Sequence, residues 1–137
     1  MQFLVKSECW PFGTMLELLL YSSHSRMAVH EMRLHPEPFA LIKAGTKTVE
    51  MRLYDEKRRL MNIGDHIEFS LRPNGVDQLR AEIVSLDVFN SFKEAFNNYP
   101  PAQYGSEHSD EWQLMYKYYS PQEEVRYGVV GVRIKKI

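Results

Sequence analysis

The residues whose types and spacing best suit chemistry lie close together in one short stretch. Lys47 and Arg52 are cations. Thr48 offers a hydroxyl. Glu50 is a carboxylate, which in its ionised form accepts hydrogen bonds and cannot donate them. Alternating apolar and polar types predict a strand over residues 48–54, in which side chains two positions apart share a face. Thr48, Glu50 and Arg52 would then share one face, and Lys47 would sit in the turn before it.

Two interpretations of this group stay open. A cation beside a carboxylate can bind a polar ring such as a nucleobase, because phosphate pairs with the cation and an exocyclic amine donates to the carboxylate. Lys47 and Arg52 would then hold a phosphate or a carbonyl. Glu50 would accept from a base amine, and Thr48 would add a hydroxyl contact. The alternative is an Arg–Glu pair on a solvated strand, worth about 0–1 kcal/mol.

Charge is unevenly distributed along the chain. The formal net charge of −1 over 137 residues gives no bulk positive field for nucleic acid. Residues 43–59 nevertheless hold six bases and three acids, which favours a local phosphate-binding surface. Residues 94–124 hold six acids and one base, which leaves open a protein partner for the acidic C-terminal half. The candidate contacts for such a partner are Glu107, Asp110, Glu111, Glu123 and Glu124.

Aromatic and histidine residues add one further candidate. Trp112, Met115, Tyr116 and Tyr119 have helical spacing, which is typical of a core stripe. Tyr118 lies off that stripe and is the best candidate for stacking on a base. The five histidines have no acidic or cysteine partner at metal-ligand spacing, so we expect no metal and no cofactor.

Hydrophobic periodicity and turn residues predict an α+β fold, a small mixed β-barrel of about five to six strands with peripheral helices. Strands are expected over 29–34, 48–54, 66–71, 79–89 and 129–134. Met32 and Leu34 are the expected inward pair of the first strand, and the turn over residues 73–77 predicts that the third and fourth strands pair as a hairpin. Helices are expected over 36–44, from Ser91 through Phe96, from Ser109, and from Ser120, where Ser120 and Glu123 fit a capping box.

The length argues for one domain, which we place at residues 28–137. Residues 1–27 are interpreted as an N-terminal extension, either genuine or the product of an over-long gene start. No stretch reaches the roughly 20 apolar residues of a membrane-spanning helix, so no membrane is expected. The lone Cys9 fits a reducing compartment, and we expect a cytoplasmic location.

Several segments together resemble an ASCH domain of the PUA-like superfamily. The most specific is the Gly-x-Lys-Thr-x-Glu-x-Arg run from Gly45 to Arg52, followed by the Gly64-Asp65 turn. The other matching segments are residues 30–34, 38–39, 63–69 and 127–132. The resemblance implies a PUA-like barrel around a cleft near Gly45, and a role in binding RNA or a modified nucleoside. The RNA or nucleoside-type ligand would meet the matching residues Lys47, Thr48, Glu50 and Arg52.

The same resemblance leaves enzyme activity open. Some relatives are amidohydrolases that deacetylate N4-acetylcytidine, and others are reported as ribonucleases. Lys47 and Arg52 match the amidohydrolase pattern, but Glu50 occupies the position of its nucleophilic threonine. A carboxylate does not simply replace a hydroxyl in acyl chemistry at neutral pH. Lys47 and Glu50 stay the catalytic candidates, with Glu50 as a general base and Lys47 or Arg52 at the oxyanion.

Overall fold

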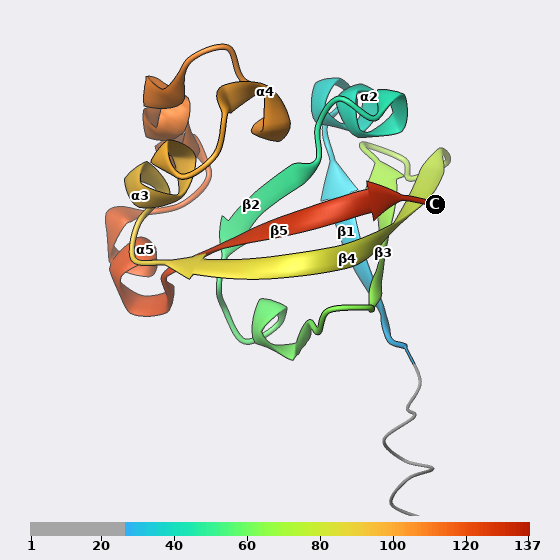
Figure 1. The fold of residues 1–137 in the computed structure, drawn as a ribbon, viewed down its shortest axis with the longest axis horizontal. Coiled ribbons are helices and arrows are strands. Elements are labelled where there is room, and N and C mark those ends of the chain that lie inside the picture. The colour runs from blue at the N-terminus through green and yellow to red at the C-terminus, as the bar shows by residue number, and fades with distance from the viewer. Residues whose placement is uncertain (1–26) are drawn as a thin grey trace, which may run out of the picture.

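Five strands form one curled sheet in the computed structural model, which describes residues 27–137 (Figure 1). Residues 1–26, which hold Cys9 and almost all of the expected extension, lie outside the described part. The order across the sheet is β1 (Val29–Leu34), β3 (His66–Leu71), β4 (Gln78–Phe89), β5 (Val129–Lys136) and β2 (Val49–Leu53).

The sheet is a half-barrel with β1 and β2 as its two edges. β1 runs parallel to β3, and the other three strand pairs are antiparallel. The expected mixed sheet with peripheral helices is therefore confirmed, with five strands and a curl that leaves an opening between β1 and β2. The predicted hairpin of β3 and β4 is also present.

Helix α2 (Pro36–Ala44) connects β1 to β2 and ends where the sequence predicts. Pro36 stands at its first position, where a missing N–H costs nothing. Gly45 follows with φ of 84°, a left-handed conformation that a residue without Cβ adopts readily, and its N–H caps the helix. This sharp end turns the chain through Lys47 into β2.

A lobe of short helices lies between β4 and β5. It contains α3 (Phe92–Asn97), α4 (Pro101–Tyr104), the 3₁₀ helix η2 (Ser109–Lys117) and α5 (Pro121–Tyr127). The capping box of Ser120 and Glu123 at the start of α5 is confirmed. Helix α4 was not predicted, because the pair Pro100-Pro101 indicates the end of α3. Pro101 instead takes the first helical position.

The stretch from Ser109 forms a 3₁₀ helix and not the α-helix expected from its spacing. With about three residues per turn, Trp112 and Met115 align and pack toward the lobe. Tyr116 falls off that line and is 37% exposed, so its predicted place in a core stripe was wrong. A second 3₁₀ helix, η1 (Arg58–Leu60), occupies the charged turn after β2.

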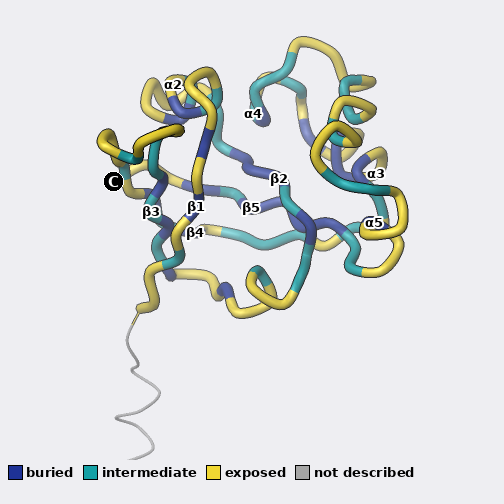
Figure 2. Tube along the Cα trace, turned by 180° about the vertical axis from the view of Figure 1, so that it is seen from behind, coloured by how far each residue is buried: buried dark blue, intermediate teal, exposed yellow. Residues whose placement is uncertain are grey.

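The buried residues divide into two clusters, and the five strands together carry most of them (Figure 2). The barrel core lies inside the curl of the sheet and includes Met32 and Leu34, the inward pair predicted for β1. The lobe core joins alternate residues of β2 to the helical lobe. Its members include Val49, Met51, Leu53, Phe92 and Phe96. Glu50, on the other face of the strand, is also buried, so β2 is covered on both faces.

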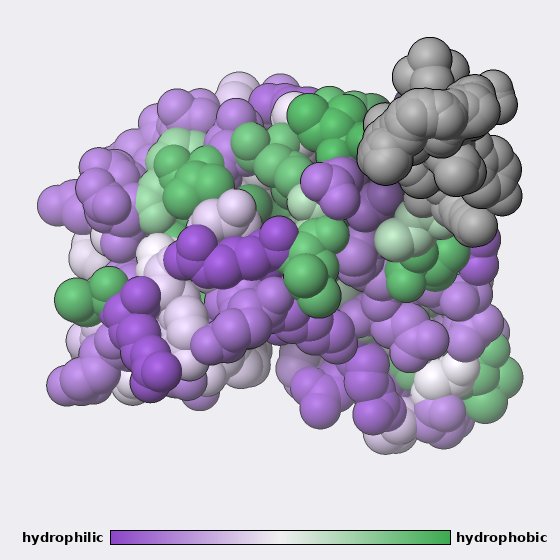
Figure 3. All heavy atoms as spheres, turned by 90° about the horizontal axis from the view of Figure 1, so that it is seen from below, coloured by the Kyte–Doolittle hydropathy of each residue, from purple (hydrophilic) through white to green (hydrophobic). Residues whose placement is uncertain are grey.

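The surface on the side of η1 is mainly hydrophilic, with apolar side chains in separate patches (Figure 3). Among residues 27–137, no helix is long and apolar enough to cross a membrane.

Candidate functional site

A pocket of about 400 Å³ lies at the opening between the two edge strands. Its walls come from β1, the start of α2, β2, and the helical lobe. The volume is in the range of about 300–1,000 Å³ that is typical of small-molecule sites. The charged and histidine residues that line it are Arg33, His35, Lys47, Glu50, Arg52, Arg72 and Glu111.

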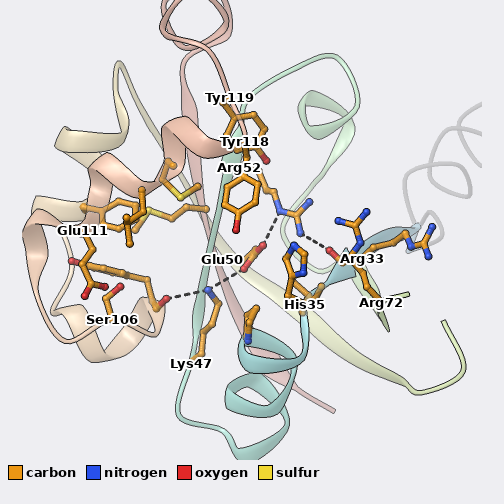
Figure 4. Close-up of a pocket in the computed structure, with 17 residues that line it drawn as sticks. Arg33, His35, Lys47, Glu50, Arg52, Arg72, Ser106, Glu111, Tyr118 and Tyr119 are labelled. Carbon is orange, nitrogen blue, oxygen red and sulfur yellow. Dashed lines mark hydrogen bonds and ion pairs between the residues drawn. The ribbon is translucent and has the colours of Figure 1, made fainter. Parts of the chain in front are cut away.

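Glu50 forms two ion pairs at this pocket. Lys47 Nζ lies 3.1 Å from Glu50 Oε1, and Arg52 Nε donates to Glu50 Oε2 at 2.7 Å (Figure 4). All three side chains are shielded from water, with 7% of the Glu50 side chain exposed and 14% or less of the two cations. The interpretation as a pair on a solvated strand was therefore wrong. β2 is covered by the lobe on one face and faces the curl of the sheet on the other.

The two cations also tie the site to elements on either side. Lys47 Nζ donates to the backbone oxygen of Tyr104 in α4 at 3.0 Å. Arg52 Nη2 donates to the backbone oxygen of Arg33 in β1 at 3.2 Å. A continuous polar chain therefore runs from the lobe, through Glu50, to the opposite edge of the half-barrel.

The ion pairs fix the protonation state of Glu50. Burial alone would raise the pKa of its carboxyl, but Lys47 and Arg52 outweigh burial and lower the pKa from 4.5 to about 2. Burial opposes the charge of Arg52, but Glu50 raises the pKa of its guanidinium. The pocket therefore contains a fixed carboxylate between two fixed cations at neutral pH.

Tyrosines close the pocket from the side of the lobe. Tyr118 is 62% exposed and lies over the pocket, with its ring centroid 6.1 Å from that of His35. Tyr119 lies beside it and stacks on Phe92 of the lobe core at 5.5 Å. Burial raises the pKa of the Tyr119 hydroxyl. Tyr119 is thus anchored in the lobe core, whereas the Tyr118 side chain is exposed at the pocket.

Four of the five residues predicted from the sequence line this pocket. Lys47, Glu50, Arg52 and Tyr118 come together there, and Thr48 does not line it. The backbone of Thr48 is used elsewhere, since its N–H donates to Gln103 and its oxygen accepts from Ile134. Thr48 precedes the first residue of β2, so strand alternation does not govern its side chain.

Sequence reasoning missed the residues that reach the pocket from β1 and from the end of β3. Arg33, His35 and Arg72 line it, although no motif joins them. Their shared position follows from the parallel pairing of β1 and β3, which places Leu34 opposite Leu71. The periodicity of either strand predicts the strand itself but gives no partner. Among residues 27–137, no three potential metal ligands come together.

One of the acidic candidates for a protein partner is not available. Glu124 is 6% exposed and accepts from the Phe92 N–H at 2.6 Å and from the Tyr116 hydroxyl at 2.7 Å. It braces α3 and η2 against α5. Glu111 lines the pocket, and Glu123 caps α5, whereas Glu107 and Asp110 are exposed.

A curled half-barrel whose open edge faces a helical lobe, with a polar pocket between them, is the PUA-like architecture. The model of the ASCH domain matches residues 32–137. The chain therefore belongs to the ASCH domain family, whose members generally bind RNA. None of the curated proteins matches the chain.

Solved structures agree with this assignment. The hypothetical protein PH0355 is 36% identical, with a TM-score of 0.71 over 80% of this chain and 99% of that one. PF0455 from Pyrococcus furiosus is 32% identical, with a TM-score of 0.62 over 80% of this chain and 97% of that one. The ASCH domain from Lactobacillus crispatus JV V101 shares the fold at 20% identity and a TM-score of 0.56, over 88% of this chain and 90% of that one.

Proposed function

We propose that the pocket binds one nucleotide unit of RNA or a nucleoside-type ligand, and that Lys47, Glu50 and Arg52 read its polar edge. The observation that carries the proposal is the buried carboxylate between two cations at a pocket of ligand size. Such a site offers both hydrogen-bond acceptors and donors, which a nucleobase needs on adjacent atoms.

The internal pairs leave capacity for a ligand. Each oxygen of Glu50 pairs with one cation, although a carboxylate has about four acceptor positions in all. Lys47 contacts Tyr104 and Glu50, and an ammonium has three donors. Arg52 uses two of its five donors, on Glu50 and Arg33. Glu50 would accept from a base amine, and the cations would donate to a base carbonyl.

The aromatic wall supplies the second part of the proposal. Proteins that bind unpaired RNA bases stack them on aromatic side chains, and each stacked base contributes about 1–3 kcal/mol. We assign this contact to Tyr118, because its side chain is exposed and lies over the charged group.

Titration of short labelled RNA tests the proposal. The variants are Tyr118→Ala and the double change Lys47→Ala, Arg52→Ala, each checked for folding by thermal denaturation. The exposed Lys135→Ala is the control, since Lys135 does not line the pocket. We expect Tyr118→Ala to weaken binding about five- to 150-fold and Lys135→Ala to leave it nearly unchanged. Equal affinity of wild type and both pocket variants would refute the proposed site.

The hydrolase alternative stays a prediction, and the geometry gives it less support. An effective general base has a pKa near the working pH, whereas the pKa of Glu50 is about 2. We therefore expect no release of cytidine from N4-acetylcytidine. Release that is lost in both Lys47→Ala and Glu50→Gln would assign these residues to catalysis instead.

A further inference from the structure

We infer that the ligand carries a phosphate, and that Arg33 and Arg72 form its phosphate subsite at one end of the pocket. This inference rests on the proposed function and makes it more specific. The cations expected to hold phosphate, Lys47 and Arg52, are paired with Glu50, which neutralises one of their two positive charges. A phosphate therefore needs further positive charge, and the described part of the chain offers two exposed arginines beside the same pocket.

The fold itself brings these arginines together, although they are far apart in sequence. β1 and β3 are parallel, so their C-terminal ends coincide at one margin of the pocket. The backbone N–H of Arg72 donates to Leu34 at 2.8 Å, directly beyond the last strand pair. Arg33 Nη2 donates to the backbone oxygen of Pro73 at 2.7 Å, which holds its guanidinium beside the residue that follows Arg72.

Among the described residues, no carboxylate pairs with the two arginines at this end of the pocket. Within residues 27–137, neither Arg33 nor Arg72 forms an ion pair with a carboxylate. Arg52 reaches the same end through its bond to the Arg33 oxygen, and His35 lies next to it. A phosphate bound at this end would place its negative charge beside these exposed guanidinium groups and accept charge-assisted hydrogen bonds from them.

The opposite end of the pocket has the opposite character. Figure 4 shows Glu111 and Ser106 across the pocket from Arg33 and Arg72. Burial raises the pKa of the neighbouring Tyr104 hydroxyl, and Glu111 and Asp110 add to that shift. A ligand that fits both ends is anionic at one end and carries hydrogen-bond donors at the other. A nucleoside monophosphate unit has this form, whereas a free nucleoside leaves the arginines without an anion.

Binding of paired probes tests the subsite. The probes are the four ribonucleosides and their 5′- and 3′-monophosphates, titrated by calorimetry at two salt concentrations. The test variant is Arg33→Ala, Arg72→Ala. The matched control is Arg126→Ala, Lys135→Ala, which removes the same charge at exposed positions away from the pocket. Arg72→Glu supplies a second test at one exposed position.

We expect at least one monophosphate to bind wild type about tenfold more tightly than its nucleoside. The arginine variant should abolish this advantage, Arg72→Glu should reverse it, and the control should keep it. On short RNA, the arginine variant should also lower the salt slope of log K by about 0.7 for each phosphate that the protein no longer neutralises. A nucleoside that binds as tightly as its monophosphates, or an advantage that survives in the arginine variant, would overturn the subsite and leave the proposed function standing. If no probe and no RNA binds to wild type, the proposed function fails as well.

Discussion

Arg52 on β2 donates from Nη2 to the backbone oxygen of Arg33 on β1 at 3.2 Å, and so joins the two edge strands of the half-barrel. Its Nε meanwhile donates to Glu50 at 2.7 Å. A single guanidinium thus positions the carboxylate of the site and spans the opening of the sheet. Only a planar fork of donors can serve both partners at fixed geometry, which a lysine cannot reproduce.

Arg52→Lys should therefore destabilise the fold although it preserves the charge. We expect a loss of about 1–3 kcal/mol in the free energy of unfolding, because the shielded Glu50 carboxylate loses its charged hydrogen bond from Nε and the more exposed Arg33 oxygen loses its donor. Urea denaturation measures the change. The control is Arg80→Lys, since Arg80 forms a partly exposed pair with Glu68 at 3.6 Å. That control should fall within about 0.5 kcal/mol of wild type. Equal effects at the two positions would contradict the bridging role of Arg52.

The ion pairs of Glu50 should appear in the pH dependence of stability. Its pKa is lowered from 4.5 to about 2 in the folded protein, so its stabilisation is fully present above pH 4.5 and is lost as pH falls toward 2. The shift corresponds to a contribution on the order of 3 kcal/mol. Glu50→Gln lacks this titration. We expect the stability gap between wild type and Glu50→Gln to be wide at pH 7 and to narrow between pH 4.5 and 2. A stability gap that does not change with pH would show that the pKa of Glu50 is not lowered by folding.

Two buried tyrosines should respond differently to loss of their hydroxyls. The Tyr99 hydroxyl donates to Asp87 at 2.6 Å, and the Tyr104 hydroxyl is buried without a partner among the described residues. Tyr99→Phe should cost about 1–2 kcal/mol, because Asp87 loses a donor. Tyr104→Phe should be neutral or stabilising, because an unsatisfied group is removed. Thermal denaturation of both variants measures these changes. A larger loss of stability in Tyr104→Phe than in Tyr99→Phe would refute these assignments.

Glu124 should behave as a structural residue and not as a surface for partners. Both of its oxygens accept hydrogen bonds, from the Phe92 N–H and the Tyr116 hydroxyl. The second of these bonds raises the pKa of Tyr116 to about 12. Glu124→Gln should lower the free energy of unfolding by about 1–3 kcal/mol. The exposed Glu107→Gln should leave it unchanged within about 0.5 kcal/mol. Similar small effects of both changes would contradict the structural role of Glu124.

Local patterns in the sequence predicted the elements well, because each depends on neighbouring residues. Gly45 ends α2, Ser120 and Glu123 cap α5, and Met32 and Leu34 face inward, all as expected. The 3₁₀ form of η2 was missed, because three or four residues per turn give similar apolar spacings over nine residues. Short-range signals cannot distinguish those two helices.

The site was predicted only where it lies on one continuous segment. Glu50 and Arg52 follow from alternation along β2, and Lys47 follows from its place in the turn just before that strand. The burial of Glu50 does not, because it depends on the lobe and the curl of the sheet that cover both faces of the strand. Arg33 and Arg72 meet through the parallel pairing of β1 with β3, a long-range relationship that no local pattern encodes.

The separation of the interior into a barrel core and a lobe core has a consequence for how the mouth of the pocket responds to substitution. One wall of the pocket is supported by strands that pack on the barrel core, and the other is supported by the short helices that pack on the lobe core over β2. A smaller side chain deep beneath the helices, at Phe92 for example, would let Tyr119 settle inward and alter the aperture above Glu50. Substitutions at positions that do not line the pocket would thus change which molecules fit the proposed site.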